Sequence, residues 1–140
     1  MSNKQKSCRT SGIEEVGHSS VRCYIQASWE ASVRRPGGTP PGVIDLSWPY
    51  GSPTVSETFS LLCYWDTYFT ALGLWADGRD ALAEGMADNL IWLIEKHGYV
   101  PRYVLEGDLT RSQIPVASTL FRERHLRRPS NCWLARAGAR

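Results

Sequence analysis

The chain has 140 residues, the length of one ordinary domain, and its net charge of only +2 gives no sign of a nucleic-acid or strongly acidic partner. That charge is uneven, because residues 1–115 carry 10 basic and 13 acidic side chains, whereas residues 116–140 carry six arginines against Glu123 alone. A hydrophobic content of 42%, with six Trp and six Tyr, excludes a wholly disordered chain and predicts a globular body with a core.

Residues 1–22 are polar, show no sustained periodicity and lack the apolar centre of a secretory signal. We expect a disordered N-terminal tail there, followed by a folded region at residues 23–140. No segment reaches the roughly 18 consecutive apolar residues that a membrane-spanning helix needs. We therefore expect a cytoplasmic chain without a membrane partner.

The next segments combine one short helix with irregular chain. Tyr24–Arg35 is predicted to be helical, with Ile25, Trp29 and Val33 at helical spacing. Residues 36–42 are rich in proline and glycine and predict a loop. Residues 43–58 contain strand-forming residues interrupted by prolines, which predicts an extended segment lying over the body rather than a member of a sheet.

A pair of helices follows. From Tyr64, the side chains of Trp65, Phe69, Leu72 and Ala76 recur at helical spacing until Asp77-Gly78. A second helix is expected from Asp80, as its N-cap, to Gly98. Its buried stripe is predicted to contain Leu82, Met86, Asn89, Leu90, Leu93 and Ile94. Because the connection is so short, the two helices must form an antiparallel hairpin.

The C-terminal part predicts further helices after an irregular crossover at residues 101–111. Ser112 is a possible N-cap for a third helix with Pro115 in its first turn, and Trp133–Ala137 could start a fourth. Helical hairpins joined by long loops make the expected fold class all-α.

Cysteine and histidine spacing argues against a metal site. Cys8, Cys23, Cys63 and Cys132 contain no close pair, which fits neither zinc binding nor a dense disulfide framework. We therefore expect reduced thiols, no metal and no cofactor.

Two short motifs could bind a neutral sugar. Tyr64-Trp65-Asp66 and Arg111-Ser112-Gln113 each lie where a loop meets a predicted helix. Asp accepts hydrogen bonds from hydroxyls, Arg and Gln supply planar donors, and an indole face covers a pyranose ring. The alternative is structural, since an Asp at a helix start is commonly a cap and a Trp at helical spacing is commonly core.

Three stretches, residues 43–59, 63–101 and 111–115, resemble in order and separation the α,α-trehalases of the family-37 glycoside hydrolases. Such enzymes carry a Tyr-Trp-Asp-(Ser/Thr)-Tyr-Phe signature and an Arg-Ser-Gln-Pro-Pro signature. Residues 119–137 look like the family helix that follows. The likeness covers about residues 24–137.

The resemblance implies an (α/α)6 barrel that hydrolyses trehalose with inversion, using an Asp as general acid and a Glu as general base. Trp65 and Asp66 would line the subsite of the non-reducing glucose, and Arg111 and Gln113 would bind sugar hydroxyls. In the family, both catalytic carboxylates lie well beyond the Arg-Ser-Gln signature. We therefore assign no catalytic residue to this chain.

Three positions depart from the commonest family pattern. Thr58 replaces a substrate-binding Arg, Cys63 replaces a Tyr, and Arg102 replaces an Asn. Arg102 would suit a glycerate carboxylate, so a second candidate is the related family-63 group that acts on mannosylglycerate or glucosylglycerate.

Length limits the barrel. Twelve helices of about 12 residues with loops of about 6 need about 216 residues, so 140 residues predict an incomplete (α/α)6 barrel made of N-terminal hairpins. Residues 23–140 would then be the truncated N-terminal part of a trehalase-like catalytic domain, inactive alone. Its unpaired apolar helix faces would favour self-association. A non-catalytic sugar-binding protein, or one that completes a barrel with a second polypeptide, is the alternative.

The arginine-rich end is interpreted as the exposed face of a barrel helix separated from its acidic neighbours, rather than as a nucleic-acid patch.

Overall fold

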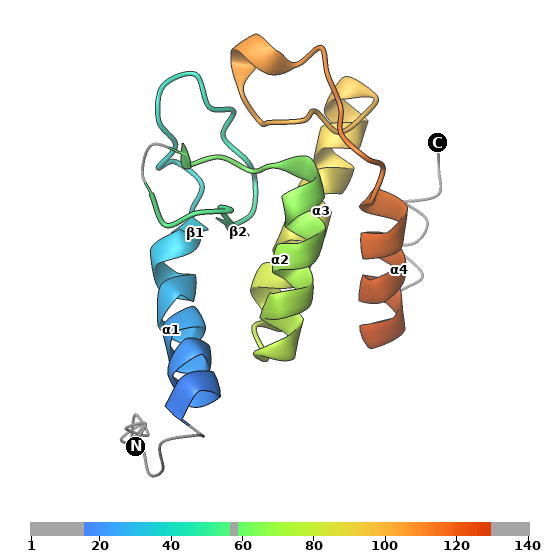
Figure 1. Cartoon of the computed structure of the whole chain (residues 1–140). Coiled ribbons are helices and arrows are strands. Elements are labelled where there is room, and N and C mark those ends of the chain that lie inside the picture. Colours follow the sequence, from blue (N-terminus) through green and yellow to red (C-terminus); the bar gives the residue numbers. More distant parts are fainter. Residues whose placement is uncertain (1–15, 57–58, 130–140) are drawn as a thin grey trace, which may run out of the picture. The chain divides into compact units, whose positions relative to one another are not determined.

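The computed structural model describes residues 16–56 and 59–129. This part of the chain contains four helices, α1 (Val16–Ser32), α2 (Tyr64–Ala76), α3 (Asp80–His97) and α4 (Ala117–Arg127), and a 3-10 turn, η2 (Glu106–Asp108) (Figure 1). Its strands are limited to β1 (Val33–Arg34) and β2 (Tyr50–Gly51). The predicted all-α class is confirmed. The chain divides into two compact units, residues 1–31 and 32–140, and each is described by itself.

The first unit contains most of α1, which begins and ends earlier than predicted. It starts at Val16 instead of Tyr24 and stops at Ser32, because Val33 and Arg34 leave the helix to form β1. Residues 16–22, expected to belong to the tail, are thus helical, and residues 1–15 lie outside the described residues. Tyr24 and Ile25 are exposed, so the helical spacing of apolar residues here does not mark a buried face.

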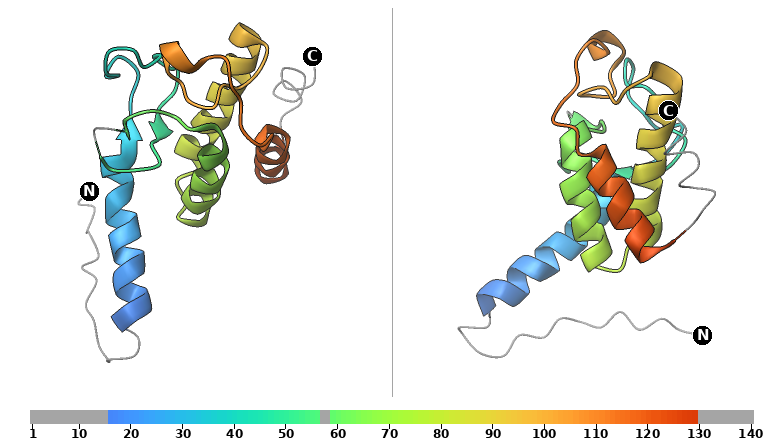
Figure 2. Two further views of the ribbon diagram at one scale, coloured as in Figure 1. Left: turned by 45° about the horizontal axis from the view of Figure 1, so that its top comes forward. Right: turned by 90° about the vertical axis from the view of Figure 1, so that its right-hand side faces the viewer.

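In the second unit, α2 and α3 form the predicted antiparallel hairpin (Figures 1 and 2). Each helix ends, as predicted, just before a glycine: α2 before Gly78 and α3 before Gly98. These residues adopt φ angles of 71° and 83°, which only glycine adopts without strain. Asp80 is the first helical residue of α3 rather than its N-cap, a position that Arg79 occupies. Its carboxylate nevertheless lies in the first turn, where it complements the helix dipole.

The buried faces of the two helices agree unequally with the sequence pattern. Four of the six residues predicted for the buried stripe of α3 are fully buried: Met86, Asn89, Leu90 and Leu93. On α2, the buried residues are instead Tyr64, Thr67, Ala71, Leu74 and Trp75. Trp65 and Phe69 are 43% and 60% exposed. The helix was therefore predicted correctly, but the apolar residues that revealed its period are not the ones that face the core, because apolar residues lie on both of its sides.

An extended segment packs tightly across the hairpin. Within this segment, residues 43–58, β2 pairs antiparallel with β1, with Val33 opposite Gly51 and Arg34 opposite Tyr50. Two residues of a segment that was expected to lie outside any sheet thus join a small one. A Cβ atom on Gly51 would lie 2.9 Å from Thr70 Cγ2 of α2, and one on Gly85 of α3 would lie 3.3 Å from Pro49 O. A larger residue at Gly51 would force Thr70 to shift, and one at Gly85 would press on the Pro49 carbonyl, so glycine suits the close approach at both positions.

The third helix of this unit, α4, packs against both members of the hairpin (Figure 2). It begins at Ala117, later than predicted, and Ser112 is not its cap, because the Ser112 hydroxyl donates to Val100 O at 2.8 Å. The predicted helix at Trp133–Ala137 lies outside the described residues. No helix in the described ranges has the length and apolarity to cross a bilayer.

Arginines of α4 meet acidic partners on α3. Arg124 Nη2 lies 3.6 Å from Asp88 Oδ2, and Arg128 Nη1, just beyond the helix, lies 3.2 Å from Glu84 Oε2. Arg124 is only 9% exposed. For Arg124 and Arg128, the interpretation of this end as a face separated from its acidic neighbours was therefore wrong, because α3 supplies those neighbours.

Candidate functional site

The start of α2 is bound by residues 99–116, which contain the irregular crossover predicted at residues 101–111. These residues are called the crossover segment below. The first peptide N–H groups of a helix have no partner within the helix, and Cys63, at the N-cap position, makes no side-chain cap. Tyr64 N–H donates to Arg102 O at 3.1 Å. Trp65 N–H donates to the side-chain oxygen Oε1 of Gln113 at 3.0 Å. Both motifs that the sequence singled out thus meet at this helix end.

Further hydrogen bonds hold the crossover segment in place. Arg102 N–H donates to Arg111 O at 2.8 Å, and Val104 N–H donates to Leu62 O at 3.2 Å. An isolated bridge pairs Cys63 with Tyr103. All of these contacts are made by the main chain. The backbone therefore fixes the Cα positions from which the side chains of the two motifs extend.

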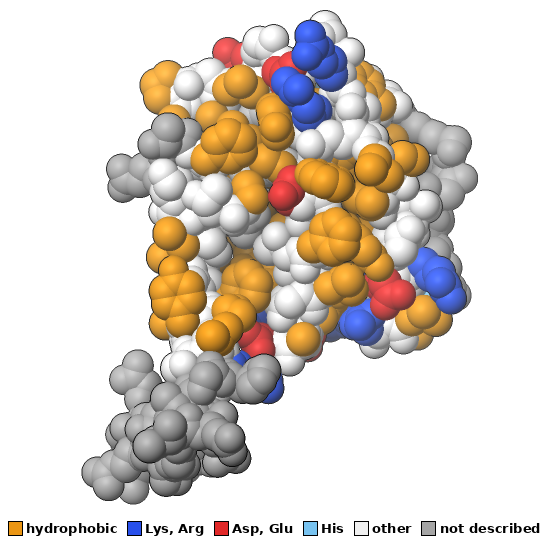
Figure 3. Space-filling model, viewed as in Figure 1, with side chains coloured by type: hydrophobic (Ala, Val, Ile, Leu, Met, Phe, Trp, Pro, Cys, Tyr) orange, Lys and Arg blue, Asp and Glu red, His pale blue; other side chains and the backbone are white. Residues whose placement is uncertain are grey.

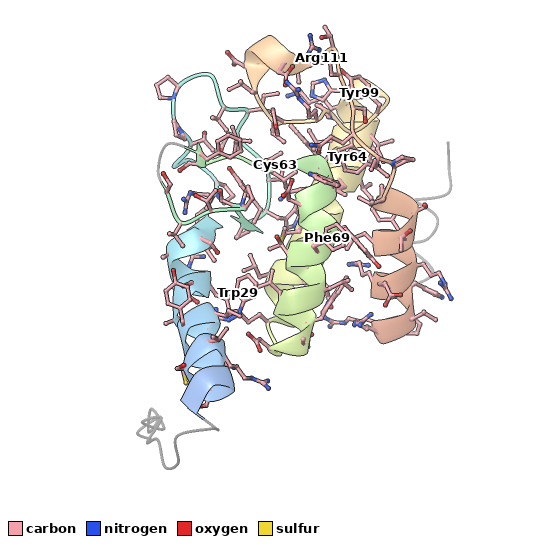
Figure 4. The ribbon with its side chains drawn as sticks, in the orientation of Figure 1. Trp29, Cys63, Tyr64, Phe69, Tyr99 and Arg111 are labelled. Carbon is pink, nitrogen blue, oxygen red and sulfur yellow. The ribbon has the colours of Figure 1, made fainter. Side chains whose placement is uncertain are left out.

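The expected sugar-binding residues differ in how exposed they are. Trp65 is 43% exposed, Asp66 is half-buried and Arg111 is exposed. No hydrogen bond joins the carboxylate of Asp66 or the guanidinium of Arg111 to another described side chain. Figure 4 shows Cys63 and Tyr64 at the start of α2, Phe69 further along it and Arg111 in the crossover segment. The two charged groups therefore remain available to a ligand.

An exposed aromatic face continues from Trp65 along α2. The ring of Trp65 meets that of Phe69 edge to face at a centroid distance of 6.4 Å, and Tyr68 meets Phe69 at 5.3 Å. Ile114, which follows Gln113, is 62% exposed. Figure 3 shows hydrophobic side chains gathered over α2 on this side of the molecule. Such a face can contact a sugar ring or another apolar surface.

Arg102, the fifth expected binding residue, has a partner within the protein. Its Nε and Nη2 both donate to Asp108 Oδ2, at 3.0 and 2.6 Å, and its guanidinium lies 4.5 Å from the centroid of the Tyr103 ring. Tyr103 in turn packs edge to face against Phe59. The hydrogen bond with Asp108 raises the pKa of Arg102, so the guanidinium stays charged. Two of the five N–H donors of this arginine, on Nε and Nη2, are thereby used inside the protein.

Neutral groups lie beneath the site. Burial, and to a smaller extent the carboxylate of Asp66, raises the pKa of the Cys63 thiol to about 12. Burial also raises the pKa of Tyr64, whose hydroxyl accepts a hydrogen bond from Ala117 N–H at 3.2 Å. Both groups are protonated at neutral pH, so neither supplies a nucleophile or a base. The Tyr64 hydroxyl instead links the start of α2 to the start of α4.

Sequence reasoning missed Asp108, Tyr103 and the role of the Tyr64 hydroxyl. Asp108 lies six residues after Arg102 in an irregular segment, where no periodicity indicates a pairing. Cys8, Cys132 and Thr58, one of the positions that depart from the family pattern, lie outside the described residues. Within the described ranges, no group of three His, Cys, Asp or Glu residues could hold a metal ion.

Comparison with known protein families places part of the chain in one of them. Residues 54–127 match the family model described as trehalase, which is more than half of the chain. The matched range contains α2, α3, α4 and the crossover segment, and so includes Trp65, Asp66, Arg102, Arg111 and Gln113.

Proposed function

Because the chain belongs to the trehalase family of glycoside hydrolases, we propose that Trp65, Asp66, Arg111 and Gln113 form part of a subsite for one glucose ring of α,α-trehalose. The observation that carries this proposal is the 3.0 Å hydrogen bond between Trp65 N–H and Gln113 Oε1. It joins the Tyr-Trp-Asp motif to the Arg-Ser-Gln motif across 48 residues of sequence. Groups of both motifs can therefore reach the same small ligand.

The chemistry of these groups suits a neutral sugar. Asp66 offers carboxylate oxygens to vicinal hydroxyls, and Arg111 offers several N–H donors. Trp65 offers an exposed ring that can cover the apolar face of a pyranose. Gln113 keeps its amide nitrogen for a hydroxyl, because only its oxygen is used by Trp65.

We propose that these residues bind and orient the sugar, whereas the acid–base pair lies outside the described part of the chain. Inverting hydrolysis needs two carboxyl groups roughly 6.5–9.5 Å apart. Two carboxylates near the proposed subsite could be considered for this pair, Asp66 and Asp108. Asp108 is paired with Arg102, so Asp66 remains as a single group. We therefore expect the 140-residue chain to bind trehalose without hydrolysing it.

The second candidate substrate class, the glycosyl-glycerates, depends on Arg102 receiving a carboxylate. Asp108 already accepts two hydrogen bonds from that guanidinium. A glycerate carboxylate would have to share this guanidinium with the carboxylate of Asp108, and the repulsion between the two like charges favours trehalose.

Calorimetric titration of the full chain with trehalose, and separately with mannosylglycerate, tests the proposal. We expect binding of trehalose, weakened about fivefold in Trp65→Ala because a stacked aromatic surface contributes about 1 kcal/mol. Trp92→Ala, on α3 outside the proposed subsite, is the control and should leave trehalose affinity unchanged. Glucose release from trehalose should not be detected. Equal affinity in both variants, or turnover by the chain alone, would contradict the proposal.

A further inference from the structure

We propose that Gln113 is a positioning residue that caps α2 from the crossover segment and thereby sets where Trp65 and Asp66 lie. Its functional consequence rests on the sugar subsite proposed above, whereas the cap itself does not. Gln113 would thus have two different roles, one for each end of its amide group.

The start of α2 needs an external acceptor. Residues in the first turn of a helix present N–H groups with no partner inside the helix, and a Ser, Thr, Asp or Asn at the N-cap commonly accepts one of them. Here Cys63 occupies that position, and its thiol makes no such bond. Gln113 Oε1 accepts the Trp65 N–H at 3.0 Å instead. A side chain 48 residues away in the sequence therefore replaces the local N-cap acceptor.

The hydrogen bond also fixes which way the amide of Gln113 points. The Trp65 N–H is a donor, so the atom facing it must be the amide oxygen, and Nε2 must point elsewhere. No other hydrogen bond of the Gln113 side chain occurs among the described residues. The nitrogen is thus directed away from the helix end and is free to donate to a ligand.

Two consecutive residues of α2 are held by the same segment. Tyr64 N–H donates to Arg102 O, and Trp65 N–H donates to Gln113. The first contact is made by the main chain and survives any side-chain substitution, whereas the second depends on residue 113 alone. Removing the Gln113 acceptor should loosen Trp65 and its neighbour Asp66 against Arg111 without unfolding the segment.

Two variants of the full chain separate the cap from mere filling of space. Gln113→Met has similar length and no strong acceptor, whereas Gln113→Glu keeps an acceptor oxygen and adds a negative charge at a helix N-terminus, where it is favourable. We expect the hydrogen-exchange protection of the Trp65 amide, measured by NMR, to fall about fivefold in Gln113→Met. Gln113→Glu should restore it. Protection of the Leu74 amide, inside α2, should stay the same in both variants.

Ser112→Ala is the matched control. It removes the hydrogen bond from Ser112 to Val100 O in the same segment but leaves the acceptor of Trp65 in place, so Trp65 protection should not change. Unaltered Trp65 protection in Gln113→Met, or failure of Gln113→Glu to restore it, would overturn the proposal.

Titration of Gln113→Met, Gln113→Glu and Ser112→Ala with trehalose distinguishes failure of this inference from failure of the proposed function. Met and Glu at position 113 both lack the amide nitrogen, so weaker trehalose binding in Gln113→Met than in Gln113→Glu, together with lost Trp65 protection, supports positioning of the subsite. If no protein binds trehalose but the protection changes as described, the sugar subsite is wrong and the cap stands. If trehalose binds while protection does not respond to the substitution, the cap is wrong.

Discussion

Asn89 shows how one buried polar side chain can hold a whole segment. It is 0% exposed on α3, its Oδ1 accepts from Trp48 N–H at 3.2 Å and its Nδ2 donates to Trp48 O at 2.8 Å. Both main-chain groups of Trp48 are thereby satisfied within the protein. The extended segment needs this because it forms no ladder there that could pair them.

Replacing Asn89 with leucine, which has a similar volume, should lower the free energy of unfolding by about 2–4 kcal/mol, because two main-chain groups of Trp48 lose their partners. Urea denaturation followed by circular dichroism measures the change. Ser118→Leu, an exposed position on α4, is the control and should stay within about 0.5 kcal/mol. A loss no greater than that of the control would mean that water satisfies Trp48.

Two buried groups, the thiol of Cys63 and the phenol of Tyr50, should make the free energy of unfolding depend on pH in the alkaline range. The pKa of Cys63 rises from 9.0 to about 12 on folding, and that of Tyr50 rises from 10.0 to about 12, in both cases through burial. Above pH 9, the unfolded chain releases protons that the folded chain keeps, so the free energy of unfolding should fall as pH rises from 9 to 12. Below pH 9, these groups should have no effect.

Urea midpoints between pH 7 and 11 test this expectation. Cys63→Ala should show a shallower decline above pH 9 than the parent chain, and Tyr50→Phe a shallower decline above pH 10. An identical decline in parent and Cys63→Ala would show that this thiol ionises as readily when folded as when unfolded.

Between elements, the α3–α4 contact contains two ion pairs of very different burial. The side chain of Arg124 is 11% exposed beside Asp88, whereas that of Arg128 is 73% exposed beside Glu84. A solvated pair contributes little, but removal of one member of a shielded pair leaves the other poorly solvated.

Arg124→Ala should therefore lower the free energy of unfolding by about 1–3 kcal/mol, from lost packing and the lost ion pair with Asp88. Arg128→Ala is the matched control on the same helix end and should change it by less than about 0.5 kcal/mol. Urea denaturation at two salt concentrations measures both. Equal losses in the two variants would mean that burial does not govern this contact.

Elements were predictable where local chemistry decides and unpredictable where packing decides. The ends of α2 and α3 follow from Gly78 and Gly98, whose positive φ angles mark the turns in the sequence itself. The inward face of α2 does not, because Trp65 and Phe69 recur at the same helical spacing as Ala71 and Leu74, and only contact with α3 selects the latter.

The site was predictable to a similar extent. The residue types of the two motifs indicated a sugar, but the 3.0 Å contact between Trp65 and Gln113 depends on the path of the crossover segment, which carries no periodic pattern. The pairing of Arg102 with Asp108 belongs to the same irregular segment, so a residue expected to receive a ligand has an internal partner instead.

For the whole molecule, the exposed aromatic face of α2 has two competing uses. Trp65, Tyr68 and Phe69 form a connected group of rings, and Phe69 is 60% exposed. Apolar surface of this kind commonly marks a contact site. The same face contains the indole that we assign to the sugar, so self-association and trehalose binding should oppose each other.

Analytical ultracentrifugation over a range of protein concentrations tests this competition. We expect self-association that Phe69→Glu weakens at least about tenfold, because a buried charge without a partner opposes contact between apolar faces. Leu126→Glu is the control, since Leu126 is equally exposed, at 61%, but belongs to α4 and not to α2. Trehalose should shift the parent chain toward monomer and leave Phe69→Glu monomeric. A chain that stays monomeric at every concentration would show that the aromatic face serves the ligand alone, whereas equal effects of the two glutamate variants would place the contact elsewhere.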